Sequence, residues 1–181
     1  MKKIALLVFL TILGNTVFAQ KMITRTGKVI FEASMPSFEE VKATNNSVSC
    51  ILNLETGDLA DLLLIKSFKF KAPLMEEHFN ENYMESTLFP KATFKGTILN
   101  FDGKNLPKSN ATYDLDGDLT IHGVTKKIKT KINVVYNSGK MNITSGFDIK
   151  PQDYKIEIPN LVKNKIAKNI NTTLNFELVT Q

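Results

Sequence analysis

Several residue types are scarce in this 181-residue sequence, which has no Trp, one Cys, two His, nine Gly and six Pro. A single Cys excludes a fold held by disulfide bonds, and with only two His it leaves no cluster for a zinc site of the usual kind. The low Gly and Pro content excludes a collagen-like chain, and 43% hydrophobic residues argue against disorder. These proportions indicate one compact domain with a substantial core.

An excess of charge of one sign is also missing, because the formal net charge is only +5. Such a balance does not indicate a nucleic-acid-binding protein. Two basic stretches, Lys126-Lys127 and residues 163–168, have no interleaved aromatic residues on which bases could stack. We therefore interpret them as solvated surface and expect no nucleic-acid partner.

Long hydrophobic runs are confined to the start of the chain. Lys2 and Lys3 precede an apolar run from Ile4 to Leu13, and small or β-branched residues stand at −3 and −1 relative to the bond after Ala19. This layout is typical of a bacterial secretory signal peptide, and the run is too short to span a bilayer comfortably. The alternative is a retained membrane anchor.

These features predict a signal peptide over residues 1–19 and one domain over residues 20–181. The product is expected in the periplasm or outside the cell, with no integral membrane segment after cleavage. Cys50 is in phase with Val48, Leu52 and Leu54, so we interpret it as a small buried hydrophobic residue.

Apolar residues recur at every second position through most of the remaining chain, which is typical of strands with one buried face. In the clearest run, Tyr113, Leu115 and Leu119 alternate with acidic and hydroxyl residues. This run meets the next one at His122-Gly123, a signal for a tight hairpin. About eight strands are predicted: residues 29–33, 48–54, 59–70, 91–101, 113–121, 124–134, 141–150 and 170–178.

Clean alternation between apolar and polar residues favours an antiparallel sheet with one wet face. Eight such strands remove their exposed edges by closing into a barrel or folding into a sandwich. The fold class is therefore all-β, with one short helix predicted over Ala72–Ser86, where Met75, Phe79 and Tyr83 recur at helical spacing with Leu74. Leu161–Lys168 is expected to form a second short helix or a loop.

The series Asp114, Asp116 and Asp118 suggests a calcium loop, but the sixth and twelfth positions hold Leu119 and Thr125 instead of Gly and Glu. We interpret the series as the solvated face of a strand, opposite lysines of its neighbour. No metal site and no cofactor is expected.

No catalytic constellation emerges from the sequence. Nucleophile-elbow, phosphate-loop and zinc-protease motifs do not occur, and Cys50 is on an inward face that disfavours a thiolate. The chain is therefore predicted not to be an enzyme. An enzyme that uses His78 or His122 stays as the third alternative.

Lys66 is unusual because it shares the inward phase of the predicted strand over residues 59–70. In that phase an ammonium group would point into an apolar interior and would need an anionic partner, such as a lipid headgroup. Its companions on that face are Leu62, Leu64, Phe68 and Phe70. The alternative is a bulge that turns Lys66 outward and puts Leu63, Ile65 and Ser67 on the other phase.

Two motifs carry a family resemblance. Glu77-His78-Phe79, then residues 82–86 (NYMES) and 89–94 (FPKATF), resemble the middle signature of the YceI-like family, and residues 117–126 (GDLTIHGVTK) resemble its second signature. His78 matches the family's histidine. The chain departs from the pattern at Met75-Glu76, where relatives often carry Arg-Asp, and over residues 35–47, where an early motif is missing.

The resemblance implies an extended, lipocalin-like antiparallel barrel that is usually periplasmic and binds polyisoprenoids or other long apolar lipids. A true lipocalin is disfavoured, since its Gly-x-Trp signature cannot occur without Trp. An eight-stranded barrel encloses room for side chains or for one slender ligand.

The sequence therefore predicts a secreted binding protein that holds a long apolar or amphiphilic lipid, of isoprenoid type, inside a barrel. The alternative is a structural or interaction module whose barrel is filled solid and has no ligand. The predicted lining residues are Leu52, Leu62, Leu64, Lys66, Phe68, Phe94, Leu119, Ile132, Phe147, Leu174 and Phe176.

Overall fold

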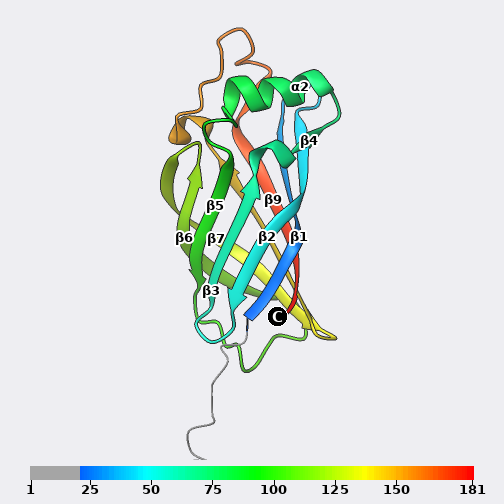
Figure 1. Ribbon diagram of the computed structural model, residues 1–181, viewed down its shortest axis with the longest axis vertical. Coiled ribbons are helices and arrows are strands. Elements are labelled where there is room, and N and C mark those ends of the chain that lie inside the picture. The colour runs from blue at the N-terminus through cyan, green and yellow to red at the C-terminus, as the bar shows by residue number, and fades with distance from the viewer. Residues whose placement is uncertain (1–20) are drawn as a thin grey trace, which may run out of the picture.

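A computed structural model describes residues 21–181 as a closed antiparallel barrel with a short helical segment across one end (Figure 1). The predicted signal peptide and its cleavage site lie outside the described residues. None of the helices within residues 21–181 is long and apolar enough to cross a membrane.

Within residues 21–181, nine strands and four short helical segments follow one another. The strands are β1 (Lys21–Ser34), β2 (Lys42–Asn53), β3 (Asp58–Leu64), β4 (Lys69–Phe70), β5 (Lys91–Ile98), β6 (Ala111–Ile121), β7 (Val124–Asn137), β8 (Lys140–Ile149) and β9 (Ile166–Thr180). The helical segments are the 3-10 turn η2 (Ile65–Ser67), the α-helix α2 (Pro73–His78), the π-turn η3 (Phe79–Tyr83) and the 3-10 turn η4 (Pro151–Tyr154).

Eight of the strands form the barrel in the order β1-β9-β8-β7-β6-β5-β3-β2, and β1 pairs with β2 to close the ring. Every pairing is antiparallel. The short strand β4 pairs through two residues with the start of β2. Closure leaves no long unpaired edge. The predicted all-β barrel of eight strands is confirmed.

The outer face of β6 and β7 confirms the interpretation of the aspartate series. The Asp114 carboxylate accepts a hydrogen bond from the Lys131 ammonium at 2.7 Å, and Asp116 lies 2.9 Å from Lys129. Both lysines are largely exposed. Such pairs contribute at most about 1 kcal/mol each, so they support the register without determining the fold.

The predicted hairpin at His122-Gly123 is also confirmed. Both residues have positive φ, 50° and 73°, as a tight two-residue turn between twisted strands requires. Gly123 tolerates this conformation without strain, whereas His122 needs compensating contacts.

Those contacts join three segments around the His122 side chain, which is 9% exposed. Its Nε2 lies 2.8 Å from the Glu85 carboxylate, its Nδ1 lies 3.2 Å from the Tyr154 carbonyl oxygen, and its ring packs edge-on against Phe89. Both polar partners are hydrogen-bond acceptors that face the two ring nitrogens. His122 therefore fastens the β6–β7 hairpin to the segment after η3 and to η4.

One end of the barrel is packed solid. Six side chains, each at most 1% exposed, fill it, and we call them the floor cluster: Met22, Leu52, Ile98, Val134, Met141 and Leu178. Met22 and Met141 lie near the starts of β1 and β8. The other four lie near the ends of β2, β5, β7 and β9. Their packing closes this end to solvent.

The other end is covered by α2 and η3, which we call the cap (Figure 1). Phe79 of the cap lies 5.1–5.7 Å, between ring centroids, from Phe31, Phe68 and Phe70 of the rim. The Glu76 carboxylate accepts hydrogen bonds from the Lys69 ammonium at 2.6 Å and from the Phe70 N–H at 3.2 Å. Aromatic contacts and one ion pair thus hold the cap on the rim.

The predicted short mid-chain helix is confirmed, with narrower bounds, since α2 and η3 together cover Pro73–Tyr83. Over Ala72–Ser86 only six residues are α-helical, because the Met84 N–H reaches back five residues to the Phe79 carbonyl and forms a π-turn. Leu74, one of the residues at helical spacing, is 61% exposed. Leu161–Lys168 forms a loop followed by the start of β9, so the loop alternative was right there.

We expect His122→Ala to lower the free energy of unfolding by about 1–3 kcal/mol, because it removes the packing against Phe89 and leaves the part-buried Tyr154 carbonyl without its partner. Urea denaturation of both proteins measures the difference. His78→Ala is the matched control: His78 is exposed on α2, and its loss should change stability by no more than about 0.5 kcal/mol. Equal losses in the two variants would contradict the fastening role of His122.

Candidate functional site

A cavity of about 570 Å³ lies inside the barrel between the floor cluster and the cap. Its volume falls within the range of roughly 300–1,000 Å³ that is typical of small-molecule sites. The wall comes from every barrel strand except β2, and the mouth is bordered by the cap and by the loops after β1 and before β9. Most of the lining side chains are aliphatic or aromatic, so the cavity suits an apolar guest.

Paired glycines help to keep this space open. Gly96 and Gly117 face each other across β5 and β6, and a Cβ on either would stand 2.5 Å from the Phe94 ring. The ring therefore occupies the place that two side chains would fill, against the barrel wall. Ala33 and Ala92 add small side chains to the lining nearer the mouth.

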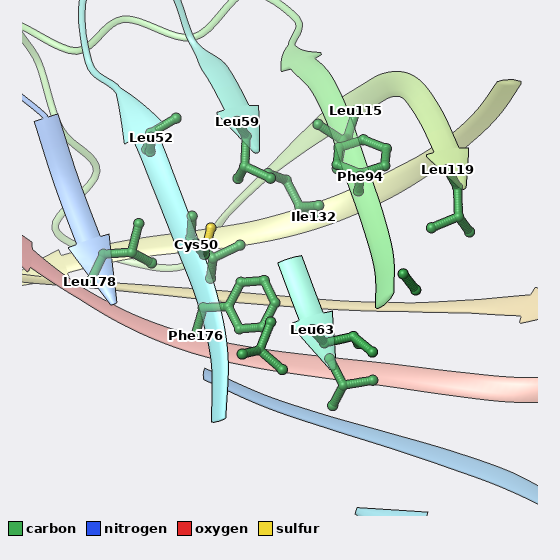
Figure 2. Close-up of a cluster of buried hydrophobic side chains, with 14 of the residues drawn as sticks. Cys50, Leu52, Leu59, Leu63, Phe94, Leu115, Leu119, Ile132, Phe176 and Leu178 are labelled. Carbon is green, nitrogen blue, oxygen red and sulfur yellow. The ribbon is translucent and has the colours of Figure 1, made fainter. Parts of the chain in front are cut away.

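Side chains from different strands converge on this interior (Figure 2). Figure 2 shows Leu59 and Leu63 of β3, Phe94 of β5, Leu115 of β6 and Phe176 of β9 directed into the barrel. Each strand contributes alternate residues to one shared surface.

Seven of the predicted lining residues border the cavity. They are Phe68, Phe94, Leu119, Ile132, Phe147, Leu174 and Phe176. Leu52 is inward and fully buried, but it belongs to the floor cluster. Their contact with a ligand stays a prediction.

The remaining three predicted residues point outward, so the phase assigned to residues 59–66 was wrong. Leu62 and Leu64 are 37% and 52% exposed, and Lys66 is exposed on the 3-10 turn η2. The alternative, in which Lys66 points outward, was right about the orientation of the side chain. The cause is the 3-10 turn η2 and not the predicted bulge. The turn shifts the phase again, and Phe68 is consequently buried.

The correct inward set on β3 is Leu59, Asp61 and Leu63, followed by Ile65. Residues 62–65 are all apolar, so alternation alone could not set their phase. The register with β5 does, because Asp61 pairs with Phe94 and Leu63 pairs with Ala92, both of which face inward. The sequence rule failed because it places carboxylates on the wet face, whereas Asp61 lies inside.

Asp61 is the chemically distinctive residue of the cavity. It lies between Cys50 of β2 and Phe94 of β5 in the sheet register. Burial among apolar side chains disfavours the charged carboxylate and raises the pKa of Asp61 to about 7, against a weaker opposite effect of the Phe94 N–H. Burial, and next the nearby Asp61 carboxylate, raise the pKa of the Cys50 thiol, which therefore stays protonated.

Other polar side chains lie toward the mouth. Glu39, His78 and Lys165 border it from the loop after β1, the cap and the loop before β9. Within residues 21–181, no three His, Cys, Asp or Glu side chains gather as metal ligands would. The arrangement therefore offers an apolar chamber, one deep carboxyl group and a polar mouth.

Asp61, which is half-buried in the cavity wall, should make stability depend on pH. The unfolded chain releases this proton near its ordinary pKa of 3.8, whereas the folded chain holds it to about pH 7. Between these values the folded state binds more protons, so the free energy of unfolding falls as the pH rises from about 4 to 7. Asp61→Asn should remove this decline, which amounts to about 1.4 kcal/mol per pKa unit.

Urea denaturation across that pH range measures the gap in stability between Asp61→Asn and the parent, which should widen as the pH rises. Asp58→Asn is the control on the same strand. Hydrogen bonds from Thr56 and Thr97 lower the pKa of Asp58, so its contribution is complete above its ordinary pKa of 3.8 and is lost only at lower pH. The gap for Asp58→Asn should therefore stay constant between about pH 4 and 7. A constant gap for Asp61→Asn would show that the carboxyl group is not desolvated.

The fold is shared with several solved structures. A polyisoprenoid binding domain from Saccharophagus degradans is 17% identical with a TM-score of 0.76, covering 89% of this chain and 98% of that one. BcnA of Burkholderia cenocepacia is 14% identical with a TM-score of 0.69, covering 84% and 96%. A YceI protein of Campylobacter jejuni is 16% identical with a TM-score of 0.61, covering 81% and 88%. At these identities the likeness concerns the fold alone.

A comparison with curated protein sequences gives no significant match. The family model described as a YceI-like domain matches residues 21–178, which includes both motifs quoted from the sequence. The match extends from the start of β1 almost to the end of β9 and confirms the resemblance. Because this match covers far more than half of the chain, the protein belongs to the YceI-like family.

Proposed function

We propose that this protein is a periplasmic or secreted carrier that holds a long apolar or amphiphilic lipid, of polyisoprenoid type, inside its barrel. The cavity of about 570 Å³ with an apolar wall is the observation that carries the proposal. The naming of the S. degradans structure as a polyisoprenoid binding domain supports the same class of ligand. The predicted signal peptide supports the location.

The size of the cavity limits the enclosed part of the ligand. A water-sized group takes about 30 Å³, so the space accommodates on the order of twenty such groups. A chain of that length gains about 0.8 kcal/mol for each methylene that leaves water. A longer chain would have to extend through the mouth.

The mouth has features of an entry site. Leu161, Leu74 and Phe38 are 87%, 61% and 45% exposed, on three segments that border it. Exposed apolar side chains gathered at one place mark a surface that meets other apolar matter. In a carrier, these residues would contact the lipid as it enters or leaves.

No observation favours the two alternatives. The solid-filled barrel describes only the floor cluster, because the space above it is open. For an enzyme, His122 is held by Glu85 and the Tyr154 carbonyl, and His78 is exposed on the cap. Neither arrangement holds a nucleophile beside an oriented base.

Filling part of the cavity should weaken lipid binding. Ala92 is inward and 8% exposed, so the ring in Ala92→Phe would project into the space that the ligand needs. We expect at least about a tenfold rise in Kd for geranylgeraniol, measured by titration calorimetry, with native mass spectrometry to count bound chains.

Ala60→Phe is the control, because Ala60 is on the outer face of β3 and its substitution should leave the Kd unchanged. The proposal fails if the parent protein neither retains lipid after mild extraction nor binds added geranylgeraniol.

A further inference from the structure

Asp61 differs from every other titratable side chain that lines the cavity. The others are Glu39, His78, Tyr83 and Lys165, which all come from loops or the cap, whereas Asp61 belongs to a barrel strand. The acidic residues of β6 point outward and pair with lysines of β7. A carboxyl group inside the barrel is therefore an exception to the pattern of its own sheet.

The register places Asp61 at the deep end of the cavity. Leu59 is one inward position below it, and Leu59 pairs with Leu52 of the floor cluster. On the opposite side of β3, Leu59 pairs with Gly96, beside the ring of Phe94. Asp61 consequently lies just above the floor, on the side of the cavity away from the mouth.

Apart from the Phe94 N–H, which weakly lowers its pKa, the surroundings of Asp61 hold no group that compensates a carboxylate withdrawn from water. It takes part in none of the ion pairs found within residues 21–181. From β2 it faces Cys50, a neutral thiol, and from β5 it faces Phe94, while Lys95 points to solvent. Of the cavity lining, only Lys165 and His78 are basic, and both are at the mouth.

A carboxylate withdrawn from water needs more than one hydrogen-bond donor, and a ligand that supplies a further donor recovers part of the cost. A carboxylate accepts hydrogen bonds, so the partner must be an N–H or O–H donor. An anionic head at this depth would face a carboxyl group with no cation near it, which is the least favourable combination.

We infer that Asp61 is a recognition group for the head of the ligand, so that the barrel takes amphiphiles head-first and selects heads that donate hydrogen bonds, such as an alcohol or an amine, over anionic heads. This inference rests on the proposed function, since it concerns the same cavity. An anionic amphiphile would enter tail-first and leave its head at the mouth beside Lys165.

The preference of the cavity for one kind of head group should change with pH. Burial raises the pKa of Asp61 to about 7, so the group changes charge near neutrality. Cys50 is the titratable group that faces it from β2, β5 presents Phe94, and the charged residues of β5 and β6 nearby point outward. A cationic head should therefore bind more tightly at pH 8 than at pH 5.5, while a neutral alcohol should depend less on pH.

Four probes of one chain length test the inference: hexadecylamine, hexadecanol, hexadecanoate and hexadecane. Their Kd values are measured for the parent, Asp61→Asn and Asp61→Leu. At pH 8 the parent should bind the amine and the alcohol about tenfold more tightly than hexadecanoate. Asp61→Asn should keep the preference for the alcohol and lose that for the amine, and Asp61→Leu should lose both. Asp58→Asn, on the outer face of β3, should behave like the parent.

The outcomes separate the two proposals. If the parent binds all four probes with similar Kd values, or if Asp61→Leu leaves their ratios unchanged, the inference is overturned and the carrier proposal stands. If the parent binds none of them but does bind geranylgeraniol, the inference is overturned and the carrier proposal stands; if it binds neither the probes nor geranylgeraniol, both are overturned. The alcohol and amine arms distinguish a neutral donor from a cation as the preferred head.

Discussion

The backbone pairing between β1 and β2 is the interaction on which the rest of this molecule depends. It joins the first and the last strands of the sheet order and so turns an open sheet into a ring. The register shifts twice around Gly27, where a Cβ would stand 2.6 Å from the Phe176 ring. The irregular register at this closure thus coincides with the place where the Phe176 side chain packs against the β1 backbone.

Because the barrel is closed, all inward side chains share one interior. This interior is filled at one end of the barrel and open at the other. At the floor, six apolar side chains from strands all around the ring meet and exclude a guest. Above it, paired glycines and small alanines leave the axis unfilled. The same alternation of inward and outward residues therefore produces a packed floor and an open cavity. The difference between them lies in the volume of the inward side chains.

The sequence predicted the architecture well wherever one face is polar. Strands 113–121 and 124–134, with their hairpin at His122-Gly123, follow directly from alternation. The prediction failed over residues 59–66, where four successive apolar residues carry no phase and the one polar marker, Asp61, is turned inward. The alternation rule assigns each residue type to the face that it usually occupies. A polar residue that faces the interior, such as Asp61, is therefore assigned to the wrong face. The fastening role of His122 was missed because its partners are distant in sequence.

Both ends of the described chain lie at the floor, where Met22 of β1 pairs with Thr180 of β9, and Figure 1 places the C-terminus on the side opposite the cap. A label, linker or solid support joined to the C-terminus would therefore be remote from the opening. Molecules immobilised in this way would all present their openings to the solution, in one orientation, without any engineering of the cap.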